Sequence, residues 1–395
     1  ITILSSVHYL KETNIREGEY YVLILFSTFG MILMAAANDL ILFFLGLETM
    51  SIAVYILTGM WREREQASEA AMKYFIIGAF ATGFFLYGVA LIYGTTGSTN
   101  LSRISTSLVQ QVNQWSPILI VGVFLLLIGL AFKVAAFPFH FWVPDVYEGA
   151  PTPITGFMAV SVKAAAFAGL ARIFLYQLAP LDNELKVPLW ALAILTMTVG
   201  NLLAIAQSSV KRMLAYSSIA HAGYLLIAVV AGGEVGGPAL LYYLLAYAPM
   251  TLGAFAVVMA LKEGERDNEE YTHYAGIGWK RPFLGIAMSI FMLSLAGFPP
   301  LAGFTGKFYI FRSAVTAGYT SLAVIGALNS LLSVIYYLRV IVMMYMEEGG
   351  VEGKPFAAAP YLYLSIAIAA LGTVFLGLLP AAALDLSRLS FLSLQ

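Results

Sequence analysis

Charged side chains occur inside long apolar stretches of this sequence, where they could carry protons. Glu48, Lys133 and Lys163 each have at least a full helical turn of mostly apolar residues on both sides. A charge at the centre of a bilayer costs about 3 kcal/mol on insertion scales, so such residues need a partner, a hydrated cavity or a route to the surface. Desolvation and nearby positive charge both disfavour an ammonium group. A buried lysine without an acidic partner can therefore load and release a proton.

Glu48 is the only acidic residue well inside an apolar stretch. If Glu48 faces Lys133, each charge stabilises the other while burial opposes both. The alternative interpretation is a static ion pair that holds two helices together. Because one buried acid cannot serve several buried cations, we expect Lys163 and Lys307 to lack an acidic partner. Glu48, Lys133, Lys163 and Lys307 are the predicted proton-carrying residues.

Two further residues are possible relays. His221 could pass protons through water, although a lone histidine inside a membrane is often a hydrogen-bonded packing residue. Lys73, like Arg172 and Arg339, lies near the end of an apolar stretch and could instead reach the membrane surface. The chain has no cysteine, which excludes iron–sulfur clusters and thiolate metal sites, and we predict no metal site.

The elements that hold these residues must be membrane helices. The chain is 60% hydrophobic and 11% charged, and its mean hydropathy is +0.84, whereas soluble domains carry about 25% charged residues. A helix needs about 20 apolar residues to cross a bilayer, and such stretches recur along the whole chain. The net charge of −1 does not point to a nucleic-acid partner. We therefore predict an all-α polytopic membrane protein.

Apolar runs between polar breaks predict eleven spans. Proline interrupts two of them, through Pro138 in FKVAAFPFHFWVP and through Pro299 and Pro300 in AGFPPLAGFTGKF. Both spans are expected to be broken helices that line a hydrated path, although such prolines can also merely kink packed helices. Lys133 precedes the first break and Lys307 follows the second. The predicted spans are 20–36, 40–60, 71–94, 116–137, 153–178, 187–207, 212–231, 238–261, 282–317, 320–346 and 358–380.

A weak internal repeat relates the two halves of the chain at an offset of 169 residues. FFLGLETMSIAVYIL (43–57) aligns with RMLAYSSIAHAGYLL (212–226), and KYFIIGAFAT (73–82) aligns with YYLLAYAPMT (242–251). Each unit has five spans, which is an odd number, so the second unit must enter the membrane upside down. We predict two inverted five-helix repeats, each with a broken helix, plus flanking helices. The predicted parts are 1–19 (the end of an upstream helix and a loop), 20–178 and 187–346 (the repeats, or half-channels) and 358–380 (a C-terminal transmembrane helix).

Lysine and arginine are unevenly distributed between alternate loops, with eleven on one side and three on the other. The positive-inside rule places the richer side, with the N-terminal end of the sequence, in the cytoplasm and the C-terminus outside. The richer side holds Lys11, Arg16, Arg62, Arg64, Lys211, Arg212, Lys262, Arg266, Lys280, Arg281 and Lys354, and the other side holds Arg103, Lys186 and Arg388.

Two motifs resemble a known family. FKVAAFPFHFWVPDVYEGAPTPITGFMAVSVKAAAF (132–167) and AGFPPLAGFTGKFYIF (296–311) are similar to the antiporter-like subunits of respiratory complex I and to the related multisubunit cation/proton antiporters. Within that family, DVYEGAPTP (145–153) is similar to the N-type subunit of complex I. The resemblance extends from about residue 20 to the end of the chain and implies a proton-translocating subunit of NADH:quinone oxidoreductase in a bacterial inner membrane.

The resemblance also implies roles and partners. It makes Glu48 the partner of the central lysine Lys133, Lys163 the connecting lysine, and Lys307 the terminal lysine, while Lys73 fits a polar position on the same axis. NADH, FMN, iron–sulfur clusters and quinone are expected in partner subunits and none in this chain, and the partners are neighbouring antiporter-like and small membrane subunits. Two alternatives remain: a cation/proton antiporter subunit, against which DVYEGAPTP argues, and a membrane scaffold whose buried charges are only structural.

Overall fold

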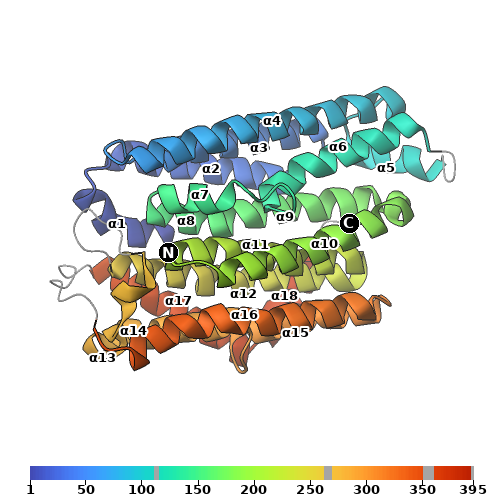
Figure 1. Ribbon diagram of the computed structural model, residues 1–395. Coiled ribbons are helices and arrows are strands. Elements are labelled where there is room, and N and C mark those ends of the chain that lie inside the picture. The colour runs from blue at the N-terminus through green and yellow to red at the C-terminus, as the bar shows by residue number, and fades with distance from the viewer. Residues whose placement is uncertain (111–114, 262–268, 350–359, 393–395) are drawn as a thin grey trace.

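The chain is a multi-pass membrane protein built from helices. The computed structural model describes residues 1–110, 115–261, 269–349 and 360–392, and in these ranges it has helices and two isolated β-bridges but no strand of a sheet. Ten helices of the described residues are long and apolar enough to cross a membrane. They run alongside one another in a single bundle (Figure 1). The predicted all-α polytopic fold is confirmed.

The predicted spans correspond to two sets of helices that follow a short first helix, α1 (Thr2–Glu12). The last crossing of the first set is interrupted by two π-helical turns, η1 and η2. The first set is α2 (Glu17–Ala36), α3 (Leu40–Thr58), α4 (Glu65–Thr96), α6 (Pro117–Val134) with α7 (Val143–Gly149), and α8 (Thr152–Phe157) with η1 (Met158–Val162), α9 (Lys163–Leu170) and η2 (Ala171–Gln177). The second set is α10 (Asp182–Ile205), α11 (Val210–Ala231), α12 (Gly233–Ala260), α14 (Pro282–Ala296) with α15 (Ala302–Thr316), and α16 (Thr320–Met346).

Both predicted helix breaks are present. Helix α6 stops before Ala135, whose φ of 62° is left-handed, and Pro138 lies in the break before α7. Helix α14 stops before Gly297, whose φ is 95°, and Pro299 and Pro300 lie in the break before α15. A left-handed residue ends a helix, and the proline that follows cannot donate the next helical hydrogen bond. Each break therefore leaves carbonyl groups at membrane depth free to bind other partners.

The two units repeat the same local contacts. Asp39 forms an antiparallel bridge with Asn100, and Ser209 forms one with Glu270, so both residues of the second pair lie 170 positions further on (39 to 209, and 100 to 270). The structural offset at these bridges is thus one residue longer than the offset of 169 taken from the sequence. Since each unit crosses the membrane five times, the second unit begins on the opposite face, as the inverted repeat requires.

A close helix crossing also recurs in both units, and it gives a stability prediction. A Cβ placed on Gly200 would lie 2.6 Å from the backbone nitrogen of Ala220, and a Cβ on Gly30 would lie 2.5 Å from that of Met50. Gly200→Ala must therefore push α10 away from α11, and we expect it to cost about 1 to 3 kcal/mol of stability, as overpacking does. The measurement is the thermal unfolding of the purified complex. Gly83→Ala is the matched control, because its Cβ would have no neighbour within 4 Å, and equal melting of the two variants would contradict the prediction.

The C-terminal region differs from the prediction. Span 358–380 corresponds to α17 (Pro360–Leu378), and residues 358 and 359 lie outside the described residues. A further helix that was not predicted, α18 (Ala381–Leu392), follows Pro380 and packs along α12. A Cβ on Gly377 would lie 2.1 Å from the carbonyl oxygen of Pro300, so α17 ends level with the second break. Pro380 ends α17 there, and α18 continues in the direction of the end of the bundle where α12 begins. An amphipathic helix, α5 (Leu101–Gln110), was also not predicted.

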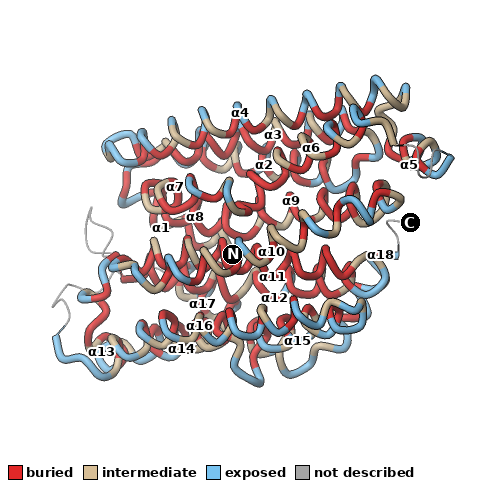
Figure 2. The backbone as a smooth tube through the Cα atoms, turned by 45° about the vertical axis from the view of Figure 1, so that its right-hand side comes forward, coloured by how far each residue is buried: buried red, intermediate tan, exposed pale blue. Residues whose placement is uncertain are grey.

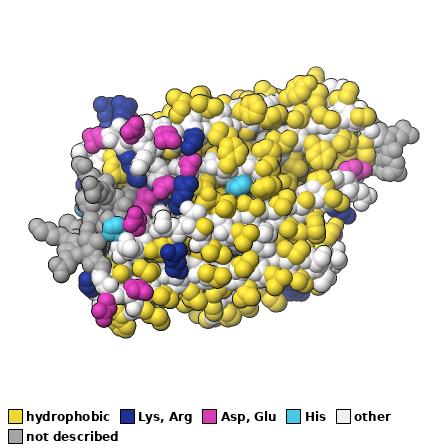
Figure 3. Space-filling view, in the orientation of Figure 1, with side chains coloured by type: hydrophobic (Ala, Val, Ile, Leu, Met, Phe, Trp, Pro, Cys, Tyr) yellow, Lys and Arg dark blue, Asp and Glu magenta, His cyan; other side chains and the backbone are white. Residues whose placement is uncertain are grey.

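The two ends of the bundle differ in charge. Acidic and basic side chains gather at one end, here called the charged face, while apolar side chains cover the middle (Figure 3). Lys262, Arg266 and Lys354 lie outside the described residues. Of the cations that the sequence assigned to the two sides, the described ones are Lys11, Arg16, Arg62, Arg64, Lys211, Arg212, Lys280 and Arg281 at the charged face, and Arg103, Lys186 and Arg388 at the opposite face.

Helix α11 is the core of the molecule. In its most apolar window 94% of the residues are buried, against 33% for α2 and α4, and it contacts α7 of the first unit as well as α10, α12, α15 and α16 of the second. Figure 2 shows burial concentrated on the inner helices and exposure on the outer ones. Side chains that project from α11 therefore meet residues of both units.

Candidate functional site

Lys163 connects the two units. Its side chain is 2% exposed, and its Nζ donates hydrogen bonds to the main-chain oxygen of Ser218 at 2.5 Å and to the Ser218 hydroxyl. Lys163 begins α9, between the π-helical turns η1 and η2. Such turns are rare and recur at functional sites, because they leave helical carbonyls imperfectly bonded. The amine of the first unit is thus held by the central helix of the second.

His221 lies one turn further along α11 and joins a chain of hydroxyl groups. Its Nδ1 is 2.6 Å from the Tyr243 hydroxyl, and its Nε2 is 3.0 Å from the Tyr337 hydroxyl. Tyr337 is in turn 2.5 Å from the Ser217 hydroxyl. A neutral imidazole donates from one nitrogen and accepts at the other, and hydroxyl groups can do either. The buried chain from Ser217 to Tyr243 can therefore reverse its hydrogen bonds when a proton passes.

Lys133 is held by hydroxyl groups and aromatic rings. Its amine at the end of α6 donates to the hydroxyls of Ser51 and Tyr55 on α3, at 2.7 and 3.2 Å. The same Nζ lies 5.1 Å from the centre of the Tyr55 ring and 5.5 Å from those of Tyr74 and Phe132. Ring faces attract cations without donating or accepting a proton. The Lys133 amine is therefore bound by neutral groups.

Glu48 does not pair directly with Lys133. The Glu48 carboxylate is half-buried and accepts a hydrogen bond of 2.9 Å from Thr82 on α4. Within the residues that the structure describes, no ion pair joins it to Lys133. The lysine instead reaches Ser51 and Tyr55, which lie one and two turns beyond Glu48 on the same helix. The direct pair implied by the resemblance is therefore not formed here.

Lys307 binds the carbonyls that the second break releases. Its Nζ donates to the main-chain oxygens of Leu295 and Ala296, at 2.9 and 3.0 Å, and to the Ser330 hydroxyl at 2.9 Å. Leu295 and Ala296 are the last residues of α14, where orphan carbonyls and the helix dipole favour a cation. The amine also lies 5.0 Å from the centre of the Tyr224 ring. The break thus builds the binding site of the lysine that follows it.

The buried lysines and His221 lie in sequence through the bundle, but hydrogen bonds do not connect all of them. Lys163 reaches Ser218 of α11, one turn from His221, and the Tyr224 ring lies between His221 and Lys307, with its centre 5.6 Å from that of the imidazole. No hydrogen bond between described residues joins Lys133 to Lys163. Lys133, Lys163 and Lys307 are buried, at 2 or 3% exposed, whereas Glu48 is half-buried.

Lys73 lies outside this series, at the charged face. Its amine, 41% exposed, pairs with Asp145 at 2.8 Å and Glu69 at 3.4 Å. Arg212 pairs with Asp145 at 3.0 Å and with Glu148 at 2.5 Å. Burial alone would raise the pKa of Asp145, but hydrogen bonds from Lys73 and Arg212 lower that pKa below its ordinary value. This cluster fixes α7 between α4 and α11.

Arg172 and Arg339 have structural roles that recur in the two units. Arg172 donates to the carbonyls of Ala36 and Ala37 at the end of α2, at 3.0 and 2.8 Å. Arg339 donates to the Gln207 carbonyl just after α10, at 3.1 Å. Each arginine therefore caps the C-terminus of the first helix of its own unit, where a cation is favoured.

Sequence reasoning missed the hydroxyl partners of the buried amines. They are Ser51, Tyr55, Ser218, Ser330, Tyr243 and Tyr337. A spacing of three or four residues between a serine and a candidate proton carrier on one helix, as for Ser217, Ser218 and His221, would have indicated part of this set. Among the described residues, no three His, Asp or Glu side chains come together as metal ligands.

Two inverted units that each place a buried lysine beside a broken helix define an antiporter-like membrane subunit. The family model of the NADH:quinone oxidoreductase/Mrp antiporter transmembrane region matches residues 37–333. The chain is 49% identical to NADH-quinone oxidoreductase subunit N of Trichlorobacter lovleyi, over 98% of this chain and 80% of that protein. The chain therefore belongs to the family of NADH-quinone oxidoreductase subunit N.

Solved structures share this fold. A chain of respiratory complex I from Thermus thermophilus matches with a TM-score of 0.81 and 41% identity, covering 97% of this chain and 84% of that one. A chain of the Mrp complex from a Dietzia species matches with a TM-score of 0.84 at 22% identity, over 99% of this chain and 82% of its own length. The second likeness shows the shared fold alone.

Proposed function

We propose that this subunit of NADH-quinone oxidoreductase carries protons across the membrane by loading and unloading Lys133, Lys163 and Lys307. The observation that supports this proposal is that three buried amines are held by hydroxyl and carbonyl oxygens and by none of the acids that the structure describes. A carboxylate partner would stabilise the ammonium form. Hydroxyl groups can donate to a neutral amine or accept from a charged one, so both protonation states can be accommodated.

In the proposed sequence, a disturbance near Glu48 changes the proton affinity of Lys133. The half-buried carboxylate lies one turn from Ser51, a ligand of that lysine, and charges interact strongly at low dielectric. The proton affinity of Lys163 then changes in turn. The change is transmitted through the hydroxyl chain of His221, and Lys307 releases a proton. Water must bridge the gaps on either side of Lys163 and beyond His221. The direction of transfer is supplied by the family resemblance.

Orientation and location are part of the same proposal. The charged face would lie in the cytoplasm of a bacterial cell, because lysine and arginine in short loops favour that side. The C-terminus would then lie outside the inner membrane, and protons would leave at the opposite face. Lys73, Asp145 and Glu148 would border the cytoplasmic side of the first unit.

Electron transfer is assigned to other subunits. The chain has no cysteine to bind iron–sulfur clusters. We propose that NADH, FMN, the clusters and quinone are bound by partner subunits, and that neighbouring antiporter-like and small membrane subunits flank this chain. The alternative is a subunit of a cation/proton antiporter, which would use the same lysines without quinone reduction.

Affinity purification from the native host separates these two functions. A tag on this chain is expected to recover flavin and iron–sulfur absorbance together with NADH:quinone oxidoreductase activity. Reconstitution of the same material should show proton uptake driven by NADH. Recovery of an assembly without flavin and clusters, but with sodium/proton exchange in vesicles, would support the antiporter alternative.

A further inference from the structure

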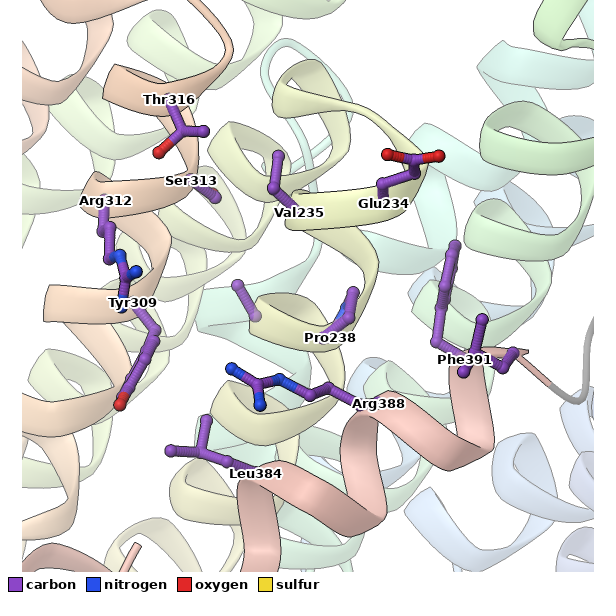
Figure 4. Close-up of a pocket in the computed structure, with 12 residues that line it drawn as sticks. Glu234, Val235, Pro238, Tyr309, Arg312, Ser313, Thr316, Leu384, Arg388 and Phe391 are labelled. Atoms are coloured by element: carbon purple, nitrogen blue, oxygen red, sulfur yellow. The ribbon is translucent and has the colours of Figure 1, made fainter. Parts of the chain in front are cut away.

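A cavity outside the proton path opens at the face opposite the charged face. It has a volume of about 520 Å³ and lies between the first turns of α12, the last turns of α15, and α18 (Figure 4). Its walls combine apolar side chains with two arginines and one glutamate. The lining residues are Glu234, Val235, Pro238, Ala239, Tyr309, Arg312, Ser313, Thr316, Leu384, Arg388, Phe391 and Leu392.

Neither arginine of the cavity has a buried acidic partner among the described residues. Arg312 and Arg388 enter the cavity from different helices. Arg312 forms neither an ion pair nor a hydrogen bond with the residues that the structure describes. Arg388 is 3.6 Å from Asp385, and both of those side chains are more than half exposed, at 61% and 69%, where such a pair contributes little. Glu234 lies at the edge of the cavity, away from both guanidinium groups in Figure 4.

The rest of the site is apolar and continues into an exposed apolar surface. Leu384 and Phe391 line the cavity. On the helices beside it, Phe308 and Val315 of α15 are each 51% exposed, and Leu389 of α18 is 66% exposed. Exposed apolar side chains of a membrane helix can pack against acyl chains. An occupant must therefore have an anionic head for the arginines and an apolar body for these walls.

We propose that this cavity binds one anionic phospholipid from the leaflet at that face. Its phosphate lies between Arg312 and Arg388, because guanidinium groups form paired hydrogen bonds with phosphate oxygens. Its acyl chains follow the apolar surfaces of α15 and α18. The lipid supplies the counter-charge that Arg312 lacks at the edge of the membrane. Since α15 carries Lys307 and α18 packs on α12, the bound lipid would also hold these helices together.

The test compares lipid retention by the intact complex. The wild-type complex and the double variant Arg312→Gln, Arg388→Gln are placed in nanodiscs of phosphatidylethanolamine with a minority of phosphatidylglycerol, and retained lipids are counted by native mass spectrometry. We expect the double variant to retain about tenfold less phosphatidylglycerol, the loss expected from removing charged hydrogen bonds. Lys186→Gln is the matched control, because this cation of the same face pairs with Asp182 at 2.7 Å, away from the cavity.

A second measurement does not depend on the stability of the double variant. A photo-crosslinking amino acid at Thr316, with both arginines intact, is expected to capture phosphatidylglycerol. Capture of a protein segment instead would assign the cavity to a neighbouring subunit and overturn the proposal. Equal retention of phosphatidylglycerol by the wild type and the double variant would also overturn it, as would equal capture of phosphatidylethanolamine.

Discussion

Replacing Lys163 with methionine is expected to stop coupled proton transfer while leaving the subunit assembled. Lys163 supplies the amine by which the first unit contacts α11 of the second, through Ser218. Methionine has a similar length and no charge, so removal of a buried amine leaves no unpaired charge behind. The Ser218 hydroxyl can then bond to a carbonyl of its own helix. We expect NADH-driven proton transfer to fall by about 100-fold or more, within the range that loss of a proton-transfer group produces.

The Lys163 prediction distinguishes a proton carrier from a structural lysine. Proton uptake by sealed vesicles and the subunit content of the purified complex are measured together. Lys186→Met serves as the control, because this partly exposed lysine lies at the opposite face in an ion pair with Asp182. If Lys163→Met lowers the amount of complex but leaves the protons moved per NADH unchanged, Lys163 is structural and the scaffold interpretation is correct.

The second large effect is expected at Lys133, where the ability to release a proton matters more than the presence of charge. Lys133→Ala removes the carrier and leaves the hydroxyls of Ser51 and Tyr55 without their donor. Lys133→Arg keeps a cation beside the same hydroxyls and rings, but a guanidinium group stays protonated in proteins. Both variants should therefore lose most coupled transfer. A lysine that only holds α6 against α3 predicts failure for alanine and near-normal function for arginine.

The fold could be predicted from the sequence because a bilayer permits few backbone structures. Apolar runs of spanning length must be helices, and proline and glycine inside such runs must break them, so the breaks at Pro138 and Pro299 were found. The end of the chain was harder to predict. Helix α18 is short and has Asp385 and Arg388 on its surface, and hydropathy alone does not distinguish it from a polar tail. Its position depends on packing against α12, which no local pattern encodes.

The charged residues of the site could be predicted from the sequence, but the groups that they contact could not. Buried lysines are conspicuous because a charge inside an apolar run is expensive. Their partners are serines, tyrosines and main-chain carbonyls, which are common in membrane helices and give no signal alone. The sequence has one acid well inside an apolar stretch, which favoured a direct pair between Glu48 and Lys133. In the structure the hydroxyls of Ser51 and Tyr55 take that place on α3.

Proton transfer per NADH oxidised by the Lys133→Arg complex in sealed vesicles tests the central claim most directly. Normal subunit content and normal NADH oxidation by the peripheral subunits with an artificial acceptor first establish that the variant has assembled. The proposal that buried lysines exchange protons predicts a proton-to-NADH ratio well below that of the wild type, because arginine at position 133 cannot release its proton. A wild-type ratio would show that a permanent charge suffices at this position, and would contradict the proposed mechanism.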